Sequence, residues 1–401
     1  MRMRMALDEQ IFIVSGVRTP IARYGGALKA VNSGYLATHV IKEALNRANI
    51  SSNQVDEVIL GEVRQSTESS NVARVAALRA GIPDTVPAFT VNRLCASGMQ
   101  AIASAVQQIQ SGQASIVVAG GTENMSRAPI YLRDSRFGED RAHLVDSNIE
   151  AGQQPIETYG ENLGMGITAE NVAEKYQISR EDQDAFALES QRRAAVAIRD
   201  GRFKDEIVPF EIKSKKSTFL FETDEHPRPE TTLDKLASLK PAFRKNGSVT
   251  AGNACGRNDG AAAVVVMSAN KVAELNLKPA ARIVDWAQVG VSPEIMGVGP
   301  VPAVKKLLER TGKSLEEIDL FELNEAFASQ ALASIRELGL DQEKVNVNGG
   351  AIALGHPVGA TGARIVVTLM HELQRRNLKY GIATLCVGGG QGMAILIENL
   401  A

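Results

Sequence analysis

The chain has 401 residues, of which 22% are charged, and a formal net charge of −2. A nucleic-acid partner is not expected, because this balance leaves no excess of basic residues to bind phosphates. The three cysteines lack paired spacing, which argues against a disulfide framework, and no stretch has the roughly 20 consecutive apolar residues of a membrane helix. We therefore expect a cytoplasmic protein with no membrane partner.

The N-terminal part of the chain alternates predicted strands with predicted helices. Apolar runs at 10–20, 55–63 and 114–125 are typical of strands. Apolar residues three and four apart predict amphipathic helices at 34–50 and 71–82, the second ended by Gly81 and Pro83. This alternation predicts an α/β fold with a mainly parallel sheet that is covered by helices on both faces.

The alternation breaks from about Asn124 to Asn253. Helices are predicted at 168–176 and 179–198, with Thr168 and Ser179 as their N-caps, whereas 217–243 is polar, contains several prolines and resembles a long loop. We interpret this region as an insertion that covers one end of the sheet. Such an insertion is a natural place for a ligand lid.

The C-terminal part returns to the first pattern. A strand is predicted at 281–290, a helix at 300–312, a strand that enters a helix at 316–335, a further helix at 359–376 and a closing hairpin at 380–399. "IDLFELNEA" resembles "VDEVILGEV", and "GIATLCVGGGQG" resembles "ASIVVAGGTE". These similarities predict two related α/β halves.

Cys95 stands in "VNRLCASGMQAI", at the expected start of a helix. A lone cysteine at such a junction is most often a small buried residue. The alternative is a thiolate nucleophile, because a helix N-terminus stabilises negative charge and lowers the pKa of a thiol.

Three further stretches carry side chains or amides with chemical potential. Asn324 and Glu325 lie where a strand changes to a helix, which is either an ordinary helix start or a polar pair of the site. His356 lies in a glycine-rich loop whose backbone can pass close to a ligand, and Cys386 precedes three glycines whose amides can form a nest for an oxyanion. All these residues follow predicted strands, at the edge where open α/β sheets bind ligands.

The stretches "NRLCASGMQAI", "NEAFA", "NGGAIALGHPVGATGAR" and "CVGGGQG" resemble the four signature blocks of the thiolase family, which comprises acetyl-CoA acetyltransferases and 3-ketoacyl-CoA thiolases. Other segments, including "VRTPIARYGGAL" and "TAGNACGRNDGAA", resemble family segments in the same order, so that the resemblance covers nearly the whole chain. It implies the thiolase fold, with two similar α/β halves, central mixed sheets and an inserted lid region of helices and loops. The corresponding division is an N-terminal half at 1–123 and 254–277, an inserted loop domain at 124–253 that binds CoA, and a C-terminal half at 278–401.

The resemblance also implies catalytic roles. Cys95 is the nucleophile that becomes acylated, and His356 is the base that activates it. Cys386 moves the proton at the α-carbon of the substrate. Asn324, acting through a water molecule, and His356 polarise the thioester carbonyl, while the backbone amides of Cys95 and Gly388 hold the oxyanion.

The CoA-binding positions implied by the resemblance are Arg228, Lys235, Phe243, Ala251 and Cys255. This chain departs from the family pattern at three places. Cys255 replaces the usual serine, Arg257 replaces an apolar residue, and Gly164 stands where biosynthetic members carry histidine. We therefore leave open the preferred acyl-chain length. The resemblance implies no cofactor beyond CoA thioester substrates, no metal, and a homo-oligomer.

The expected function is that of an acetyl-CoA C-acetyltransferase, with a longer-chain 3-ketoacyl-CoA thiolase as the alternative and a non-catalytic acyl-CoA carrier as a remote one. A cysteine hydrolase would also pair Cys95 with His356, but it has no use for Cys386 beside a glycine nest. A zinc site made from these three residues lacks a short C-x-x-C pair.

Overall fold

Ten strands form one continuous mixed sheet in the computed structural model, which describes residues 10–138, 141–150, 153–159, 163–213 and 217–400. The strand order is β12-β13-β14-β11-β1-β10-β5-β3-β4, and the short β2 pairs with β10. The strands are β1 (Ile11–Arg18), β2 (Ala22–Arg23), β3 (Glu57–Gly61), β4 (Ala88–Val91), β5 (Ile116–Asn124), β10 (Asn258–Ser268), β11 (Ala281–Gly290), β12 (Leu320–Leu323), β13 (Tyr380–Val387) and β14 (Gln391–Asn399).

The expectation of a mainly parallel sheet is wrong. Parallel pairing is confined to β3 with β4 and β5 and to β12 with β13, whereas all other neighbours in the sheet are antiparallel. β13 and β14 are antiparallel because a short turn joins them, whereas the antiparallel pairs of β10 with β5 and with β1 join strands distant in the sequence. The antiparallel contact between β1 and β11, with Ile11 opposite Ile283, joins the two halves.

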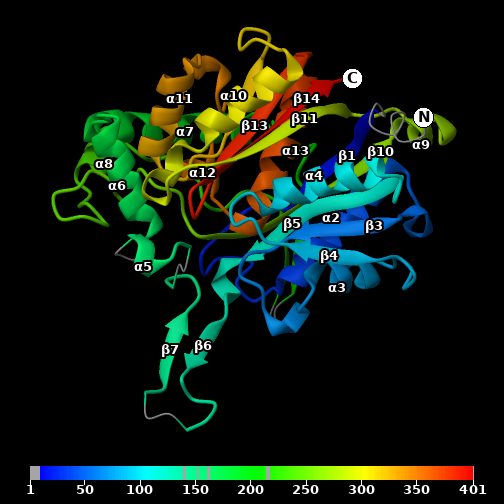
Figure 1. Cartoon of the computed structure of the whole chain (residues 1–401), viewed down its shortest axis with the longest axis horizontal. Coiled ribbons are helices and arrows are strands. Elements are labelled where there is room, and N and C mark those ends of the chain that lie inside the picture. Colours follow the sequence, from blue (N-terminus) through cyan, green and yellow to red (C-terminus); the bar gives the residue numbers. More distant parts are fainter. Residues whose placement is uncertain (1–9, 139–140, 151–152, 160–162, 214–216, 401) are drawn as a thin grey trace.

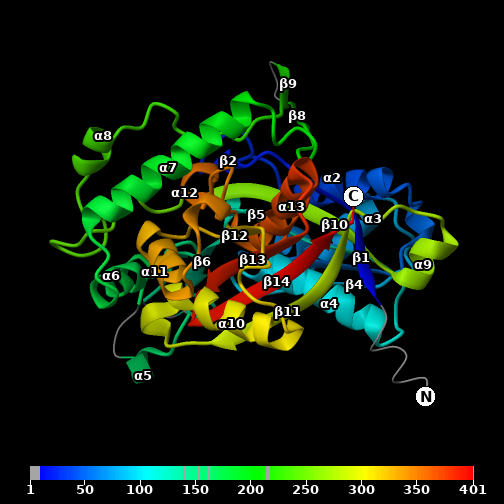
Figure 2. The same cartoon turned by 90° about the horizontal axis from the view of Figure 1, so that it is seen from above.

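Five layers of helix and sheet result from the way the sheet folds back on itself (Figures 1 and 2). Helices α4 (Ser97–Gln110) and α13 (Val358–Arg376) form the middle layer, and they share one apolar core with β-strands of both halves. Along β10, Val264 and Val266 belong to this inner core, whereas Val265 belongs to the outer core, as the period of two in a strand requires. The outer layers are α2 (Ser33–Ala48) with α3 (Val72–Arg79), and α10 (Pro300–Thr311) with α11 (Ala328–Leu338).

Glycines allow the two middle helices to begin in close contact. A Cβ atom added at Gly98 would lie 2.7 Å from the backbone nitrogen of Ala363, and one added at Gly362 would lie 2.4 Å from that of Met99. Both distances are far below van der Waals contact, so any side chain at these positions would push the helices apart. The glycines therefore bring the N-terminal turns of α4 and α13 together.

The region between the halves contains a hairpin, several helices and long loops. The hairpin of β6 (Ile130–Arg133) and β7 (His143–Asp146) projects from the rest of the molecule (Figure 1). The other elements are α5 (Ile156–Tyr159), α6 (Met165–Lys175), α7 (Arg180–Arg199), β8 (Phe210–Lys213), β9 (Thr218–Phe221) and α8 (Leu233–Ala237). Elsewhere the chain adds α9 (Ala269–Glu274), α12 (Ala351–Leu354) and 3₁₀ turns at Ser52–Gln54, Thr67–Ser69, Met125–Arg127, Pro293–Val298 and Gln342–Lys344.

One of the two predicted N-caps in this region is confirmed. The Ser179 side chain accepts a hydrogen bond from the backbone N–H of Asp182 at the start of α7. The prediction for Thr168 is wrong, because α6 begins three residues earlier, with Gly164 as its N-cap. Within α6, the Thr168 hydroxyl donates to the Met165 carbonyl at 2.7 Å, a bond that a threonine inside a helix commonly forms.

Candidate active site

A tight turn between β4 and α4 presents the half-buried Cys95. Leu94, just before it, has φ +46°, a left-handed conformation that costs a non-glycine residue about 1–3 kcal/mol. Ser97 holds this turn, since its Oγ accepts from the Arg93 N–H at 2.9 Å and donates to the Leu94 carbonyl at 2.6 Å. The strained turn places the thiol at the N-terminus of a buried helix.

Two backbone amides lie near the Cys95 sulfur, the N–H of Gly388 and the N–H of Cys95 itself. Burial raises the pKa of the thiol, while these two amides and the Arg64 guanidinium oppose the increase. The two amides that the resemblance implies for the oxyanion hole therefore both lie near the sulfur.

His356 is a buried imidazole with one nitrogen in use and one free. Nδ1 lies 2.7 Å from Thr361 Oγ1, and that hydroxyl lies 3.0 Å from the Pro357 carbonyl, to which it donates. Since the hydroxyl proton is committed to Pro357, Nδ1 must be the donor in its bond to Thr361. Nε2 is buried without a partner among the described residues, and burial together with the Arg364 charge lowers the His356 pKa to about 3. The imidazole is thus neutral, with the Nε2 lone pair available to accept a proton.

Asn324 follows β12 directly, and its side chain is buried. Its backbone N–H donates to the Thr384 carbonyl at 3.0 Å, which fixes it beside the end of β13. Neither Oδ1 nor Nδ2 has a hydrogen-bond partner within the described part of the chain. Buried amides are almost always hydrogen-bonded, so this one is suited to hold a water molecule or a substrate oxygen.

The neighbouring Glu325 has a structural task. Its carboxylate accepts from Ser190 Oγ at 2.7 Å and Asn346 Nδ2 at 2.8 Å, and from the Ile352 N–H at 3.2 Å. These bonds tie α7 to the loops before and after residue 350. Of the polar pair in the sequence, only Asn324 has free hydrogen-bonding groups.

Cys386 lies one residue before the end of β13 and is completely buried. It packs with Ala254 and Phe327 in a small apolar cluster, against which the half-buried Cys255 also packs. Burial raises the Cys386 pKa well above its ordinary value, and the nearby Cys95 and Cys255 raise it further. The hairpin turn beyond it has positive φ at Gly389 and Gly390.

All three cysteines of the chain therefore meet at one place. The Cys255 N–H donates to the Ala326 carbonyl at 3.0 Å, which attaches its loop to the turn after β12. Burial and Cys95 raise the Cys255 pKa to about 12. The backbone of Arg257 pairs with that of His356, so the same loop also contacts the segment that carries the imidazole.

Four of the five predicted CoA-binding residues lie on loops, and Lys235 lies in the short helix α8. The Phe243 ring meets the Phe327 ring edge to face, with centroids 6.1 Å apart, close to Cys386 and Cys255. Arg228 lines an open cavity of about 580 Å³ together with Arg257, Arg23 and His226. Lys235 and Ala251 are exposed, and Lys235 Nζ donates to the Glu230 carbonyl at 2.9 Å.

Gly164 and Arg257, two departures from the family pattern, differ in their surroundings. No atom of the described residues would lie within 4 Å of a Cβ atom added at Gly164, so the position faces open space among them. Arg257 is exposed and lines the same 580 Å³ cavity as Arg228. The Arg257 side chain therefore faces that cavity, outside the apolar cluster around Cys386.

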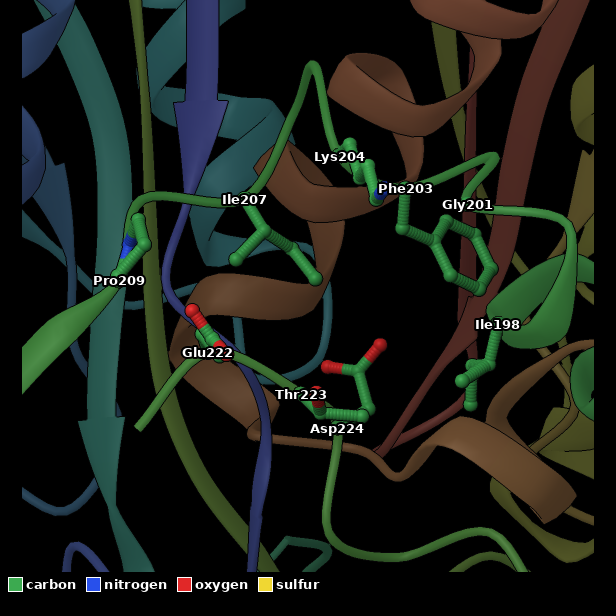
Figure 3. A pocket seen from close by; sticks show the side chains of 9 residues that line it. All are labelled: Ile198, Gly201, Phe203, Lys204, Ile207, Pro209, Glu222, Thr223 and Asp224. Atoms are coloured by element: carbon green, nitrogen blue, oxygen red, sulfur yellow. The ribbon is translucent and has the colours of Figure 1, made fainter. Parts of the chain in front are cut away.

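A second cavity, of about 420 Å³, contains none of the predicted site residues (Figure 3). Lys204, Glu222 and Asp224 are among its lining residues. The carboxylate oxygens of Asp224 accept hydrogen bonds from the buried Arg18 guanidinium at 2.7 and 2.9 Å, so the negative charge of Asp224 is neutralised by this ion pair. We assign this cavity no part in the chemistry.

Sequence reasoning missed several residues that shape the site. Thr361 orients His356, and Glu123 accepts from the backbone N–H groups of Val63, Arg64 and Gly359 at 2.9–3.0 Å. Gln153 Oε1 is buried without a partner among the described residues, and it lies 2.0 Å from where a Cβ atom of Gly388 would be. Thr361 could have been found from the sequence, because it is a polar residue in the stretch "GHPVGAT" beside His356. No sequence pattern points to Gln153.

Comparison with known proteins identifies the family. The thiolase N-terminal domain matches residues 11–270, and the thiolase C-terminal domain matches residues 277–399. An acetyl-CoA acetyltransferase of Syntrophomonas wolfei is 50% identical over 400 residues, covering 98% of this chain and 100% of the relative. The crystal structure of the Bacillus anthracis acetyl-CoA acetyltransferase superposes with a TM-score of 0.95 and 53% identity, covering 98% of this chain and 99% of that one.

A 3-ketoacyl-CoA thiolase is nearly as similar in structure. The human mitochondrial 3-ketoacyl-CoA thiolase superposes with a TM-score of 0.94 and 46% identity, covering 98% of this chain and 100% of the other. The chain therefore belongs to the thiolase family. Within its described residues, no helix is long and apolar enough to cross a membrane.

Proposed function

We propose that this protein is an acetyl-CoA C-acetyltransferase, which joins two molecules of acetyl-CoA into acetoacetyl-CoA and free CoA, reversibly. The observation that carries the proposal is the position of Cys95 at the N-terminus of α4 near a second thiol, the buried Cys386. Similarity to acetyl-CoA acetyltransferases over nearly the full chain supports this choice of reaction.

In the first half-reaction, the Cys95 thiol gives its proton to His356 Nε2 and its sulfur attacks the carbonyl carbon of acetyl-CoA. The oxyanion of the tetrahedral intermediate takes hydrogen bonds from the N–H groups of Cys95 and Gly388. The bond from carbon to the CoA sulfur then breaks, and His356 returns the proton to the departing CoA. The product is an acetyl-cysteine.

In the second half-reaction, Cys386 removes a proton from the α-carbon of a second acetyl-CoA. The enolate oxygen is stabilised by a water molecule held on Asn324, whose free amide supports this role. The enolate carbon attacks the acetyl group on Cys95, and acetoacetyl-CoA leaves as the Cys95 sulfur is released. Cys386 acts in its thiolate form when it takes the α-proton, and it then passes that proton to the released Cys95 sulfur, so that Cys386 serves as a base and then as an acid.

The loop residues are proposed to hold the CoA moiety. Phe243 and Cys255 adjoin the thiol cluster, which suits the pantetheine end, whereas Arg228 and Lys235 are exposed cations suited to phosphates. Ala251 is exposed and lies in a turn between Phe243 and Cys255 in the sequence. The region 124–253 would thus act as the CoA-binding domain, with 1–123 and 254–277 as one half and 278–401 as the other.

A longer acyl chain is the second candidate, because Gly164 faces open space. One methylene changes binding by about 1–3 kcal/mol in an apolar pocket, so the spare volume is compatible with longer substrates. Thiolysis measured as kcat/KM across 3-ketoacyl-CoA substrates of increasing length decides between the two. A steep fall beyond four carbons supports the dedicated acetoacetyl-CoA enzyme, whereas a rise with length supports the 3-ketoacyl-CoA thiolase.

A labelling experiment tests the chemistry itself. Treatment with acetyl-CoA followed by mass spectrometry is expected to show one acetyl group on Cys95, and C95A is expected to lose both the label and turnover. Net release of acetate would indicate a cysteine hydrolase, and absence of both label and turnover would indicate a carrier. A label on Cys386 or Cys255 would contradict the assigned roles.

We also propose that the protein forms a homo-oligomer. On the projecting hairpin, Ile130 is 65% exposed and Leu144 73% exposed, and β4 forms an uncovered edge of the sheet. Apolar side chains and open strand edges of this kind are commonly covered by another copy of the chain. Light scattering at micromolar concentration tests this, and a monomer would contradict it.

A further inference from the structure

Gln153 packs directly against the turn that carries the proposed oxyanion amide of Gly388. A Cβ atom added at Gly388 would lie 2.0 Å from Gln153 Oε1 and 2.6 Å from Cδ of the same side chain. The backbone oxygen of Gln153 lies 2.9 Å from where a Cβ atom of Gly389 would be. The Gln153 carboxamide therefore occupies the place that a side chain at position 388 would take.

This contact lies on the side of the turn that faces the thiols. Gly388 directly follows β13, and successive side chains of a strand point to opposite faces, so position 388 faces the same side as Cys386. The neighbouring Val387 belongs to the inner core, whereas Cys386 packs in the small apolar cluster that Cys255 also contacts. The Gln153 carboxamide thus lies over the same face of β13 as this cluster.

A side-chain hydrogen bond joins this turn to the one that presents Cys95. Arg93 Nη1 donates to Gln391 Oε1 at 3.3 Å, which connects the β4–α4 turn to the first residue of β14. The Gly388 N–H lies near the Cys95 sulfur. One residue, Gly388, is therefore both close to the nucleophile and in contact with Gln153.

The Gln153 carboxamide has an unused hydrogen-bonding group. Oε1 is buried and accepts no hydrogen bond from any described residue. Buried side-chain oxygens are almost always hydrogen-bonded, so this oxygen is suited to a donor on a ligand. Cys255, the residue proposed to adjoin the pantetheine end, offers only a weakly hydrogen-bonding sulfur.

The chemistry of an acyl-CoA shows which of its groups fits an acceptor at this place. The acetyl group and the thioester carry no N–H or O–H. The donor nearest to the reacting carbonyl is the cysteamine amide N–H of the pantetheine arm, which an ethylene group separates from the sulfur. An acceptor beside Gly388 is therefore matched to this amide.

We propose that Gln153 Oε1 accepts a hydrogen bond from the cysteamine amide N–H of the bound acyl-CoA and thereby holds the thioester beside Cys95. Gln153 takes no proton and forms no covalent bond. This role rests on the proposed function, because it places a CoA thioester at Cys95. It applies to every acyl-chain length, since all acyl-CoA substrates share this amide.

The test compares kcat/KM for thiolysis of acetoacetyl-CoA with that of an analogue in which an ester oxygen replaces the cysteamine N–H. The wild-type protein is expected to use the analogue about tenfold less well, because Oε1 loses its donor. Q153L is expected to use acetoacetyl-CoA about tenfold less well than the wild type does, and to use the analogue as well as acetoacetyl-CoA. The two changes are not additive, as is typical of groups in direct contact.

Q288L is the matched control. Gln288 lies on β11, is half-buried like Gln153, and also has a buried Oε1 without a partner among the described residues. Q288L is expected to keep the wild-type kcat/KM and the wild-type preference for acetoacetyl-CoA over the analogue. Circular dichroism checks the fold of each variant, and Q153A replaces Q153L if Q153L does not fold.

The proposal is overturned if the wild type uses both substrates equally well, or if Q153L keeps the wild-type kcat/KM for acetoacetyl-CoA. It is also overturned if Q153L still prefers acetoacetyl-CoA about tenfold, because a merely structural effect on the turn slows both substrates alike. A failure of the proposed function would appear separately, as the absence of acetyl on Cys95 in the wild-type protein. If the wild type carries acetyl on Cys95 and Q153L keeps the preference, the nucleophile is correct and the role of Gln153 is wrong.

Discussion

Thr361 Oγ1 lies 2.7 Å from Nδ1 of His356 and donates its own proton to the Pro357 carbonyl, 3.0 Å away. Both residues belong to the first turns that lead into α13, so the helix itself holds the hydroxyl in place. Because the hydroxyl has only one proton, the arrangement fixes the imidazole in the tautomer that leaves Nε2 free. The hydrogen bond between His356 and Thr361, five residues apart in the sequence, thus decides which imidazole nitrogen can act as a base.

Thr361→Val is expected to lower kcat by about 10–100-fold, since it removes the acceptor for Nδ1–H while keeping the shape of the side chain. KM for acetyl-CoA is expected to change little, because Thr361 is proposed to act through His356. Steady-state kinetics provide the measurement. T361S, which keeps the hydroxyl, is the control, and equal losses in both variants would contradict the tautomer argument.

Cys386→Ser is expected to separate the two half-reactions. Acetylation of Cys95 from acetyl-CoA should remain measurable, whereas condensation and thiolysis should fall by about 100-fold or more, because only the proton transfer at the α-carbon lacks its thiol. Single-turnover labelling and steady-state rates measure the two effects. Equal losses in both would show that Cys386 does not have a separate role.

Gly98→Ala is expected to destabilise the protein by about 1–3 kcal/mol. The added methyl would lie 2.7 Å from the Ala363 backbone nitrogen, and this clash outweighs the better helix propensity of alanine, worth about 1 kcal/mol. Urea unfolding measures the free-energy difference. G164A is the control, since its methyl meets open space, and the two variants should therefore differ clearly.

Glu62→Gln is expected to make the free energy of unfolding less dependent on pH. Burial raises the pKa of Glu62 to about 8, so the folded protein holds a proton that the unfolded chain loses near its ordinary value of 4.5. This contribution to stability is complete below that ordinary value and is lost as pH rises towards about 8. In that window the wild-type stability should fall with pH more steeply than that of E62Q, by about 1.4 kcal/mol per pH unit.

Denaturant titrations at several pH values measure this slope for both proteins. Ser33 Oγ donates to Glu62 Oε1 at 2.5 Å, and the glutamine oxygen can accept the same bond. The folded structure should therefore tolerate the change. Parallel pH profiles for the two proteins would contradict the predicted state of Glu62.

The α/β class, the family and the closing hairpin could be predicted from the sequence and are confirmed. The prediction of a mainly parallel sheet was wrong because an apolar run does not show in which direction its strand runs in the sheet. β10 and β5 have similar compositions but run antiparallel to each other. The prediction of Thr168 as an N-cap was wrong because a threonine inside a helix has the same side chain as a threonine at its start. The boundaries at 123, 253 and 277 remain predictions, as do the roles of the site residues.

The candidate site shows why some residues escaped prediction. Cys95, Asn324, His356 and Cys386 stand beside glycines or at changes of secondary structure, where the sequence itself gives a signal. Glu123 and Gln153 lie in contacts between segments distant in the sequence, as between Glu123 and Gly359. Such contacts depend on how α4 and α13 pack between the sheets, which no local pattern describes.

The position of α4 and α13 in the middle layer has a consequence for variation within this protein. Helices enclosed between the two halves of the folded sheet cannot shift without disturbing both outer layers, so the groups at their N-termini form a rigid reaction centre. The loop that carries Arg228 belongs to neither of the two largest cores, and Arg228 can be exchanged without repacking that centre. An engineer seeking a new acyl range should therefore graft loop segments and leave the two inner helices untouched.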